Sequence, residues 1–219
     1  MKKQTLQFML FMFQFSHSLV AISQDRLTGT GDRLTYEFIQ LSSADNKPIR
    51  YTRTLELSQD GDRTHWYSDK TRKNTFDRDF TLIESPRGKV EKDEQFARVP
   101  IGVEVGKKWK TSYRYPSTAE GCGTGITNYD AAAESGPDFS VVMDGKETIV
   151  KTIQINYKGW WRCSHATYSG RIESEIIYSP SLNEILSYFH TQYTPQMQIW
   201  VQYKTVLKGI QRPKGAATK

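Results

Sequence analysis

The stretch VPIGVEVGKKWKTSYRY, residues 99–115, combines a turn-rich loop with a strand, and it decides the fold class. Pro100 and Gly102 shape the loop, and Gly106 tightens the turn that leads into the strand. Beyond the turn, Trp109, Thr111, Tyr113 and Tyr115 share one face, while Lys110, Ser112 and Arg114 share the other. Side chains that alternate with a period of two predict a β-strand. Trp109 is expected to anchor the loop to the core, where its indole needs a hydrogen-bond partner.

The same alternation recurs along most of the chain and predicts further strands. Candidates are residues 34–41, 49–57, 64–68, 76–83, 148–157, 171–178 and 199–207. In the fifth run, Ile149, Ile153, Ile155 and Tyr157 are expected on one face. A phase slip at Phe38–Ile39 predicts a bulge in the first run. Residues 128–135 are the one place where a helical turn or two is expected.

Turn signals separate the predicted strands and favour antiparallel hairpins. They are Asp60-Gly61, Pro86-Arg87-Gly88, Asp144-Gly145 and Ser179-Pro180-Ser181. We therefore expect an all-β protein in one domain, with about ten strands and little helix. The sheet should be large, curved and antiparallel, or an open half-barrel. Because few helices are available to cover its apolar face, a strongly curved sheet would leave a groove.

The N-terminus has the pattern of a secretory signal peptide. Lys2 and Lys3 precede an apolar run at residues 6–15, and the small residues Ala21 and Ser23 suit a cleavage site. A buried N-terminal helix is the alternative. We expect a signal peptide at 1–23, a β domain at 24–208 and a flexible basic tail at 209–219. The mature chain should be periplasmic or secreted, with no transmembrane segment.

The net charge of the chain does not indicate which partners it binds. Loss of residues 1–23 removes two lysines and no acidic residue, which lowers the formal net charge from +6 to +4. Lys107–Lys108 and the basic tail could favour anionic lipid or glycan surfaces, although a solvated surface explains them as well. The export signal argues against nucleic acid as a partner.

The two cysteines, Cys122 and Cys163, are expected to form a disulfide in an oxidising compartment. Such a bridge closes a loop of about 40 residues, which the chain-entropy model credits with about 4 kcal/mol. Two free thiols, one of them nucleophilic, are the alternative.

No motif in the sequence indicates a particular catalysed reaction. The histidines of the mature chain, His65, His165 and His190, lack metal-ligand spacing. The glycines of GCGTG, residues 121–125, lack the lysine and helix of a phosphate loop. Acidic pairs such as Glu173 with Glu175, and Asp77 with Asp79, occur on any solvated strand face, although a glycosidase also uses two carboxylates. We expect no catalytic residues, no metal and no cofactor.

Aromatic side chains are the remaining signal. Trp160 and Trp161 are adjacent, so in a strand they point to opposite faces. The same holds for Trp66 and Tyr67. One of each pair can be core, while the other meets solvent, a ligand or a partner. The candidate ligand contacts are Trp109, Tyr113, Trp160, Trp161 and Trp200.

Three segments give the chain a resemblance to a known group. They are VPIGVEVGKKW at 99–109, YKGWWRCSHATYSG at 157–170 and IIYSPSLNEILSYF at 176–189. Together they resemble uncharacterised bacterial periplasmic proteins built as long, curved antiparallel sheets, similar in shape to the half-barrels of lipoprotein carriers. The resemblance covers about half the chain and implies a curved sheet, with no catalytic residues to transfer.

The sequence is consistent with three candidate functions. The first is a non-catalytic envelope protein that binds an apolar or amphipathic ligand, such as a lipid, a lipidated protein or an envelope glycan. The second is a periplasmic protein–protein module: an inhibitor, immunity factor or scaffold. The third is a glycan hydrolase that uses an acidic pair.

Overall fold

The computed structural model describes residues 28–42, 47–68, 72–86, 88–90, 97–99, 103–117, 125–163 and 169–213. Within them the chain forms fourteen strands and no helix. The strands are β1 (Arg33–Ser42), β2 (Pro48–Asp60), β3 (Arg63–Tyr67), β4 (Lys73–Phe76), β5 (Leu82–Ser85), β6 (Gly88–Lys89), β7 (Trp109–Ser117), β8 (Gly125–Ser135), β9 (Phe139–Met143), β10 (Lys146–Val150), β11 (Ile153–Cys163), β12 (Ser169–Ser179), β13 (Glu184–Tyr193) and β14 (Ile199–Gln211). The predicted all-β class is confirmed, with fourteen strands in place of about ten.

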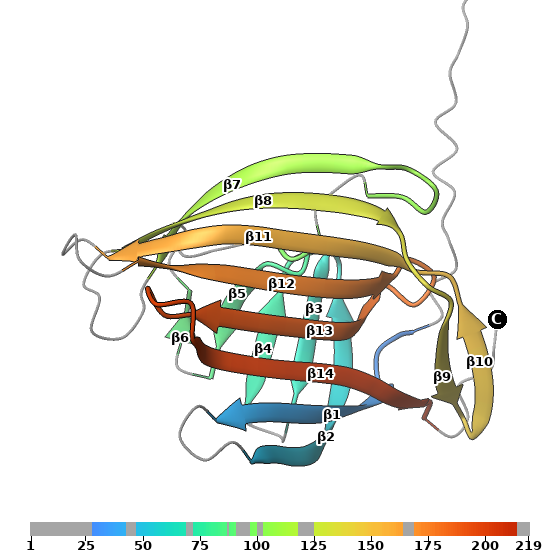
Figure 1. Ribbon diagram of the computed structural model, residues 1–219. Helices are drawn as coiled ribbons and strands as arrows, with labels where there is room; N and C mark the ends of the chain where they lie inside the picture. The colour runs from blue at the N-terminus through green and yellow to red at the C-terminus, as the bar shows by residue number, and fades with distance from the viewer. Residues whose placement is uncertain are drawn as a thin grey trace, which may run out of the picture.

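All fourteen strands belong to one sheet, in the order β6-β5-β4-β3-β2-β1-β14-β13-β12-β11-β8-β7. Neighbours along this path are antiparallel, while the β9–β10 hairpin joins the sheet through a short parallel contact between β9 and β14. The strands at the two ends of the order, β6 and β7, are not paired with each other. The sheet is therefore open, and Figure 1 shows that it is strongly curved.

The sheet folds back on itself. Figure 1 shows β3, β4 and β5 crossing behind β12, β13 and β14. Contacts between the two halves confirm this, because Phe80, which precedes β5, packs edge-on against Tyr178 of β12 with ring centroids 5.8 Å apart. The N-terminal half of the sheet thus covers much of the concave face of the C-terminal half.

The core lies inside this curl and consists of two main clusters. One joins Leu34 and Leu57 of the N-terminal strands to Leu186 and Leu207 of β13 and β14. The other joins Phe80 and Val99 to the inner faces of β8, β11, β12 and β13. The groove expected from the scarcity of helices is therefore largely filled, by strands of the same sheet.

Most predicted turns are present. Gly61 and Asp62 connect the paired residues Asp60 and Arg63 of β2 and β3. Asp144 and Gly145 connect β9 to β10, and both have positive φ (49° and 82°), as a type I′ turn requires. The predicted Ser179-Pro180-Ser181 turn leads from β12 into β13, where Asn183 also has a positive φ of 49°.

Two predictions about local structure are wrong. Residues 128–135 form part of β8 instead of helical turns, and alternate residues of this strand, Ala131 and Ala133, are buried against the core. The irregularity in β1 lies at Thr35/Tyr36, against β14, and not at Phe38–Ile39. There it keeps Tyr36 directed into the core, where its side chain is 3% exposed.

Two predicted strand runs are also interrupted. Residues 76–83 do not form one strand, since Asp77–Thr81 make a turn in which Phe80 has a φ of 58° and donates its backbone N–H to Asp77 O. A break at Lys151–Thr152 separates β10 from β11 and shifts the alternation. Ile149 is consequently 61% exposed, while Ile153 and Ile155 are fully buried.

Both chain ends bear on the predicted domain limits. The predicted signal peptide at 1–23 lies outside the described residues. At the other end, β14 continues to Gln211, which pairs with Arg33 of β1, so the predicted flexible tail begins too early at residue 209. None of the elements in the described part of the chain is a helix with the length and hydropathy needed to cross a bilayer.

Candidate functional site

A pocket of about 660 Å³ lies along the inner faces of the N-terminal strands. Its lining includes Phe38 of β1, Arg53 of β2, Trp66 of β3, Arg72 just before β4, Phe76 of β4, and Arg98. Its volume falls within the range of pockets that hold small ligands, about 300–1,000 Å³. This is the part of the expected groove that the core leaves open.

Aromatic rings form two walls of the pocket. Phe38 stacks on Tyr51, its partner across β1 and β2, with centroids 5.1 Å apart and planes 4° from parallel. Trp66 packs against Phe76 with centroids 4.7 Å apart. Both pairs join adjacent strands, so the backbone pairing fixes where the rings stand.

Two arginines lie over these rings. The guanidinium carbon of Arg53 is 5.1 Å from the Tyr51 centroid and 5.7 Å from that of Phe38. The guanidinium carbon of Arg98 is 5.5 Å from the Phe76 centroid and 5.8 Å from that of Tyr188 on β13. Such cation–π contacts hold a guanidinium in place without consuming its N–H donors.

The backbone of residues 97–99 is held inside the curl. Tyr157 of β11 donates its hydroxyl to Arg98 O at 2.8 Å, and Val99 N donates to Asp79 O at 2.9 Å. The Val99 side chain is buried in the core cluster. The position of Arg98 is therefore fixed by both halves of the sheet.

A buried polar group adjoins the pocket at Glu184, which is fully buried. Its Oε1 accepts hydrogen bonds from Tyr36 Oη (3.1 Å) and from the backbone of Ile185 (2.9 Å). Burial raises the pKa of Glu184 to about 8, against the opposing effects of the Ile185 N–H, Tyr36 and Trp66. The carboxyl group is therefore mostly protonated at neutral pH.

Neither Glu184 Oε2 nor Trp66 Nε1 has a hydrogen-bond partner within the described part of the chain, and both atoms are buried. Trp66 nevertheless lies close enough to Glu184 to lower the pKa of the carboxyl group. This under-satisfied pair sits behind the aromatic wall that Trp66 gives to the pocket. Ionisation of Glu184 there would place an uncompensated charge in the core.

A second polar cluster lies on the inner face of β12, β13 and β14. His190 Nδ1 is 2.8 Å from Ser174 Oγ and 3.4 Å from Tyr188 Oη, and its ring lies 4.9 Å from that of Tyr203. Burial, and then the charge of Arg98, lower the pKa of His190 to about 4. The imidazole is therefore neutral at physiological pH.

The five predicted ligand contacts do not meet in one place. Trp109 is half-buried against the core cluster of β8 and β11. The side chain of Tyr113 lies outside the described atoms, although its backbone pairs with Tyr129 of β8. Trp160 is 58% exposed on the convex face, opposite Arg171 of β12 and Asn128 of β8.

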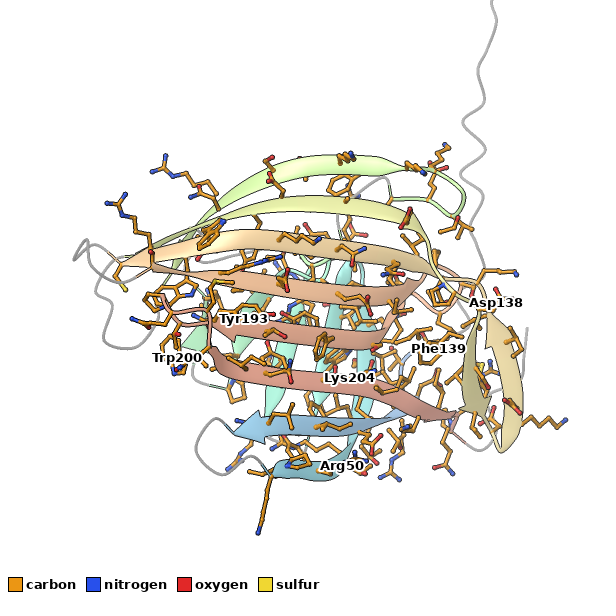
Figure 2. The ribbon with its side chains drawn as sticks, in the orientation of Figure 1. Arg50, Asp138, Phe139, Tyr193, Trp200 and Lys204 are labelled. Carbon is orange, nitrogen blue, oxygen red and sulfur yellow. The ribbon has the colours of Figure 1, made fainter. Side chains whose placement is uncertain are left out.

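Trp161 and Trp200 meet near the ends of their strands, with ring centroids 5.7 Å apart. Trp161 is buried over Gly170, its partner across β12, and donates its indole N–H to Tyr193 O at 3.2 Å. A Cβ at Gly170 would collide with Tyr193 O and with this indole. Figure 2 places Trp200 and Tyr193 near one another at this end of the sheet. Trp161 therefore has a packing role. This agrees with the expectation that Trp160 and Trp161 point to opposite faces of the strand, so that one of them can be core.

The predicted acidic pair lies on the convex face with existing partners. Glu173 is paired with Arg171 and accepts a hydrogen bond from Tyr193 Oη at 3.2 Å, while Glu175 accepts one from Gln154 at 2.9 Å. Among the described residues there is no group of three or more histidine, cysteine, aspartate or glutamate side chains that could hold a metal ion. His65 contacts Thr75 Oγ1 at 2.9 Å, and His165 lies outside the described residues.

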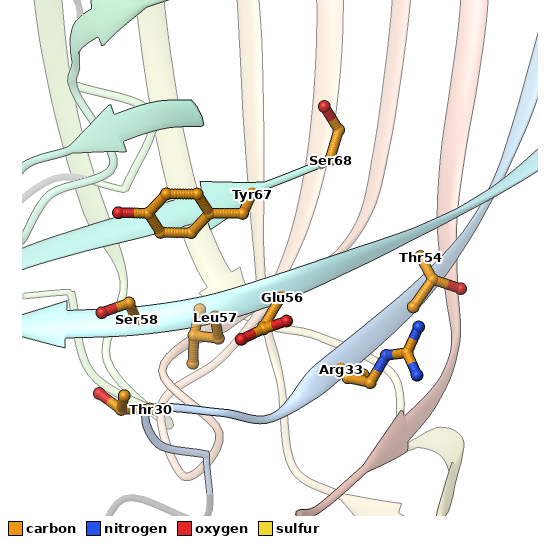
Figure 3. Close-up of a pocket in the computed structure, with 8 residues that line it drawn as sticks. All are labelled: Thr30, Arg33, Thr54, Glu56, Leu57, Ser58, Tyr67 and Ser68. Atoms are coloured by element: carbon orange, nitrogen blue, oxygen red, sulfur yellow. The ribbon is translucent and has the colours of Figure 1, made fainter. Parts of the chain in front are cut away.

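A separate polar pocket of about 420 Å³ lies on the outer face of β1, β2 and β3. Figure 3 shows Arg33 and Glu56, which face each other across β1 and β2, with Tyr67 beyond them on β3. A cation and a carboxylate on facing positions balance each other's charge. This pocket therefore offers no ligand a clear electrostatic preference.

The predicted disulfide stays a prediction. Cys163 is buried at the end of β11 beside Trp161, whereas Cys122 lies outside the described residues. The loop GCGTG lies there too, except for Gly125, the first residue of β8.

Sequence reasoning missed the residues that line the inner pocket. The strand runs at 34–41 and 49–57 put Phe38 on one face of its strand, and Tyr51 and Arg53 on one face of theirs. Nothing in the sequence indicated that these two strands would pair with those faces turned toward Arg98. That arrangement depends on the folding back of the sheet.

No protein-family model and no curated protein sequence matches this chain. Among solved structures, it is similar to the hypothetical lipoprotein YmcC of Escherichia coli, at 6% identity and a TM-score of 0.42, over 84% of this chain and 90% of that one. It is also similar to a candidate lipoprotein of Parabacteroides distasonis (11% identity, TM-score 0.36, 85% and 97% coverage). A candidate exported protein with a YmcC-like fold from Bacteroides fragilis has 10% identity, a TM-score of 0.32, and 83% and 95% coverage. At these TM-scores the likeness supports no transfer of function or of residue roles.

Proposed function

We propose that this chain is an exported, non-catalytic envelope protein that binds an amphipathic ligand in the inner pocket. The supporting observation is the pocket itself, where stacked aromatic walls and positioned guanidinium groups face one space of about 660 Å³. The export signal pattern at residues 1–23 supports an envelope location. Lipids and lipidated chains combine the apolar and polar parts that such a pocket accepts.

The energetics favour a ligand with an apolar portion. Each Å² of apolar surface removed from water contributes about 25 cal/mol before ordering costs. The rings of Phe38, Tyr51, Trp66 and Phe76 are already held by stacking and by strand pairing, so little side-chain freedom is lost on binding.

The proposal is tested by titrating the mature protein with the fluorescent apolar probe N-phenyl-1-naphthylamine. Asn74 lines the pocket and pairs with Trp66, so Asn74→Trp fills the space with a second indole. We expect this variant to weaken probe binding by tenfold or more. Trp160→Ala is the control, because Trp160 lies on the convex face. Unchanged binding in Asn74→Trp, or lost binding in Trp160→Ala, contradicts the proposal.

A protein–protein module is the second candidate, and exposed Trp160 is the observation that favours it. Trp160 lies opposite Arg171, and aromatic and arginine side chains are enriched at interfaces. Within the described part of the chain, the edge strand β7 also pairs only with β8, which leaves room for an added strand. A stable complex that depends on Trp160, with no ligand in the inner pocket, would favour this candidate.

The hydrolase hypothesis stays open to a direct test. Activity on envelope polysaccharides that disappears in Glu173→Gln or Glu175→Gln would support it. Glu173 is already paired with Arg171 and Tyr193, and Glu175 with Gln154. Partners of this kind are those of a solvated strand face.

A further inference from the structure

We propose that the ligand of the inner pocket is a single-chain anionic amphiphile, whose carboxylate or phosphate head is bound by Arg53 and Arg98. This inference rests on the proposed function and adds the charge class of the ligand and the residues that select it. It is carried by the geometry of the two arginines and by the charge balance of the lining.

Both guanidinium groups lie over rings and are available to an anion. Arg53 lies over Tyr51 and Phe38, and Arg98 lies over Phe76 and Tyr188. A cation–π contact with a ring does not use up the N–H donors of a guanidinium as a hydrogen bond to an acceptor would. Those donors match the two oxygens of a carboxylate or phosphate.

No carboxylate competes for these donors within the described part of the chain. Neither Arg53 nor Arg98 belongs to any of the ion pairs there. Among the described residues that line the pocket, Arg53 and Arg98 are the two whose guanidinium groups lie over aromatic rings, and no lining residue is acidic. The nearby Glu184 is mostly protonated at neutral pH, since burial raises its pKa to about 8. An anion therefore meets a net positive surface.

The rest of the lining suits an apolar chain. Phe38, Leu55, Trp66, Phe76 and Leu82 contribute rings and aliphatic groups to the same pocket. The charged and apolar parts of the lining together match a molecule with one anionic head and one apolar tail. The volume of about 660 Å³ favours a single chain over a ligand with several tails.

The experiment compares two fluorescent probes that differ only in charge: cis-parinaric acid and its methyl ester. We expect the acid to bind at least tenfold more tightly than the ester at low ionic strength, and added salt to weaken only the acid. In Arg53→Gln/Arg98→Gln, the affinity for the acid should fall to that for the ester. Arg98→Lys should keep part of the preference, because it retains the charge but loses the planar fork.

The matched control is Arg50→Gln, an exposed arginine of the same strand, β2, that does not line the pocket. It should bind both probes as the wild type does. Arg53 is exposed, so Arg53→Gln alone should fold and lose part of the preference even if the double variant does not fold.

Three outcomes overturn the inference in distinguishable ways. Equal affinity for acid and ester, or an unchanged preference in Arg53→Gln, refutes the anionic head while leaving amphiphile binding intact. Displacement of the acid by millimolar inorganic phosphate, with no displacement by dodecyl alcohol, would indicate a small-anion site instead. Failure of both probes to bind would refute the proposed function itself.

Discussion

Glu184 should make the protein less stable as the pH rises through neutrality. Its pKa is about 8 in the folded chain, because of burial, against 4.5 for the ordinary value. A carboxyl group with a raised folded pKa stabilises the fold fully below its unfolded pKa, and that contribution is lost as the pH rises through the folded pKa. The window of loss therefore runs from about pH 4.5 to about pH 8.

His190 acts in the opposite sense over part of that window. Its pKa is lowered to about 4 from the ordinary 6.5, so its contribution is present above pH 6.5 and is lost as the pH falls toward 4. Between pH 4.5 and 6.5 the two groups nearly cancel. Above pH 6.5 Glu184 dominates, which makes that interval the informative one.

The magnitude follows from about 1.36 kcal/mol per pKa unit. From pH 6.5 to 8, Glu184 should lower the free energy of unfolding by about 2 kcal/mol, and His190 offsets only a small part of this loss. Urea unfolding at the two pH values should therefore show a net loss of roughly 1–2 kcal/mol in the wild type. Glu184→Gln cannot ionise and should show no such loss.

Glu56→Gln, at an exposed position of β2, is the control and should keep the wild-type slope. The reasoning is refuted if the wild type is equally stable or more stable at pH 8 than at pH 6.5. It is also refuted if Glu184→Gln shows the same loss as the wild type.

The remaining predictions concern packing and one further titration. Gly170→Ala should lower the melting temperature strongly, because its Cβ would collide with Tyr193 O and the Trp161 indole. Trp161→Ala should cost about 3–5 kcal/mol in chemical unfolding, whereas exposed Trp160→Ala should stay within about 0.5 kcal/mol of the wild type; equal effects would contradict their opposite faces. His190 offsets Glu184 between pH 4.5 and 6.5, so on acidification over that interval His190→Gln should gain stability while the wild type changes little; a wild-type response in the variant would contradict this.

Strand periodicity was sufficient to predict the class of the fold. The alternation in residues 109–115 and the turns at Asp60-Gly61 and Asp144-Gly145 are local signals, and the structure contains the features they indicate. Local signals failed where a short turn interrupts an apolar run. Ile149 precedes the break at Lys151–Thr152, and Phe80 occupies a turn although its neighbours resemble a strand.

The candidate site could not be predicted because it depends on contacts distant in sequence. Arg98 lies between Phe76 of β4 and Tyr188 of β13, and only the folded sheet brings those strands together. Glu184 is similar, since its burial depends on contacts such as the hydrogen bond from Tyr36 of β1, which is 148 residues away along the chain. Of the predicted ligand contacts, the exposed Trp160 lies on the convex face, away from this pocket.

The most direct test of the central claim is native mass spectrometry of the exported protein, purified without detergent. We predict a population that carries an extra mass equal to one anionic single-chain lipid, and we predict its loss in Asn74→Trp, which fills the pocket. A bare protein mass in the wild type would contradict ligand binding, and an adduct that persists in Asn74→Trp would place the ligand elsewhere.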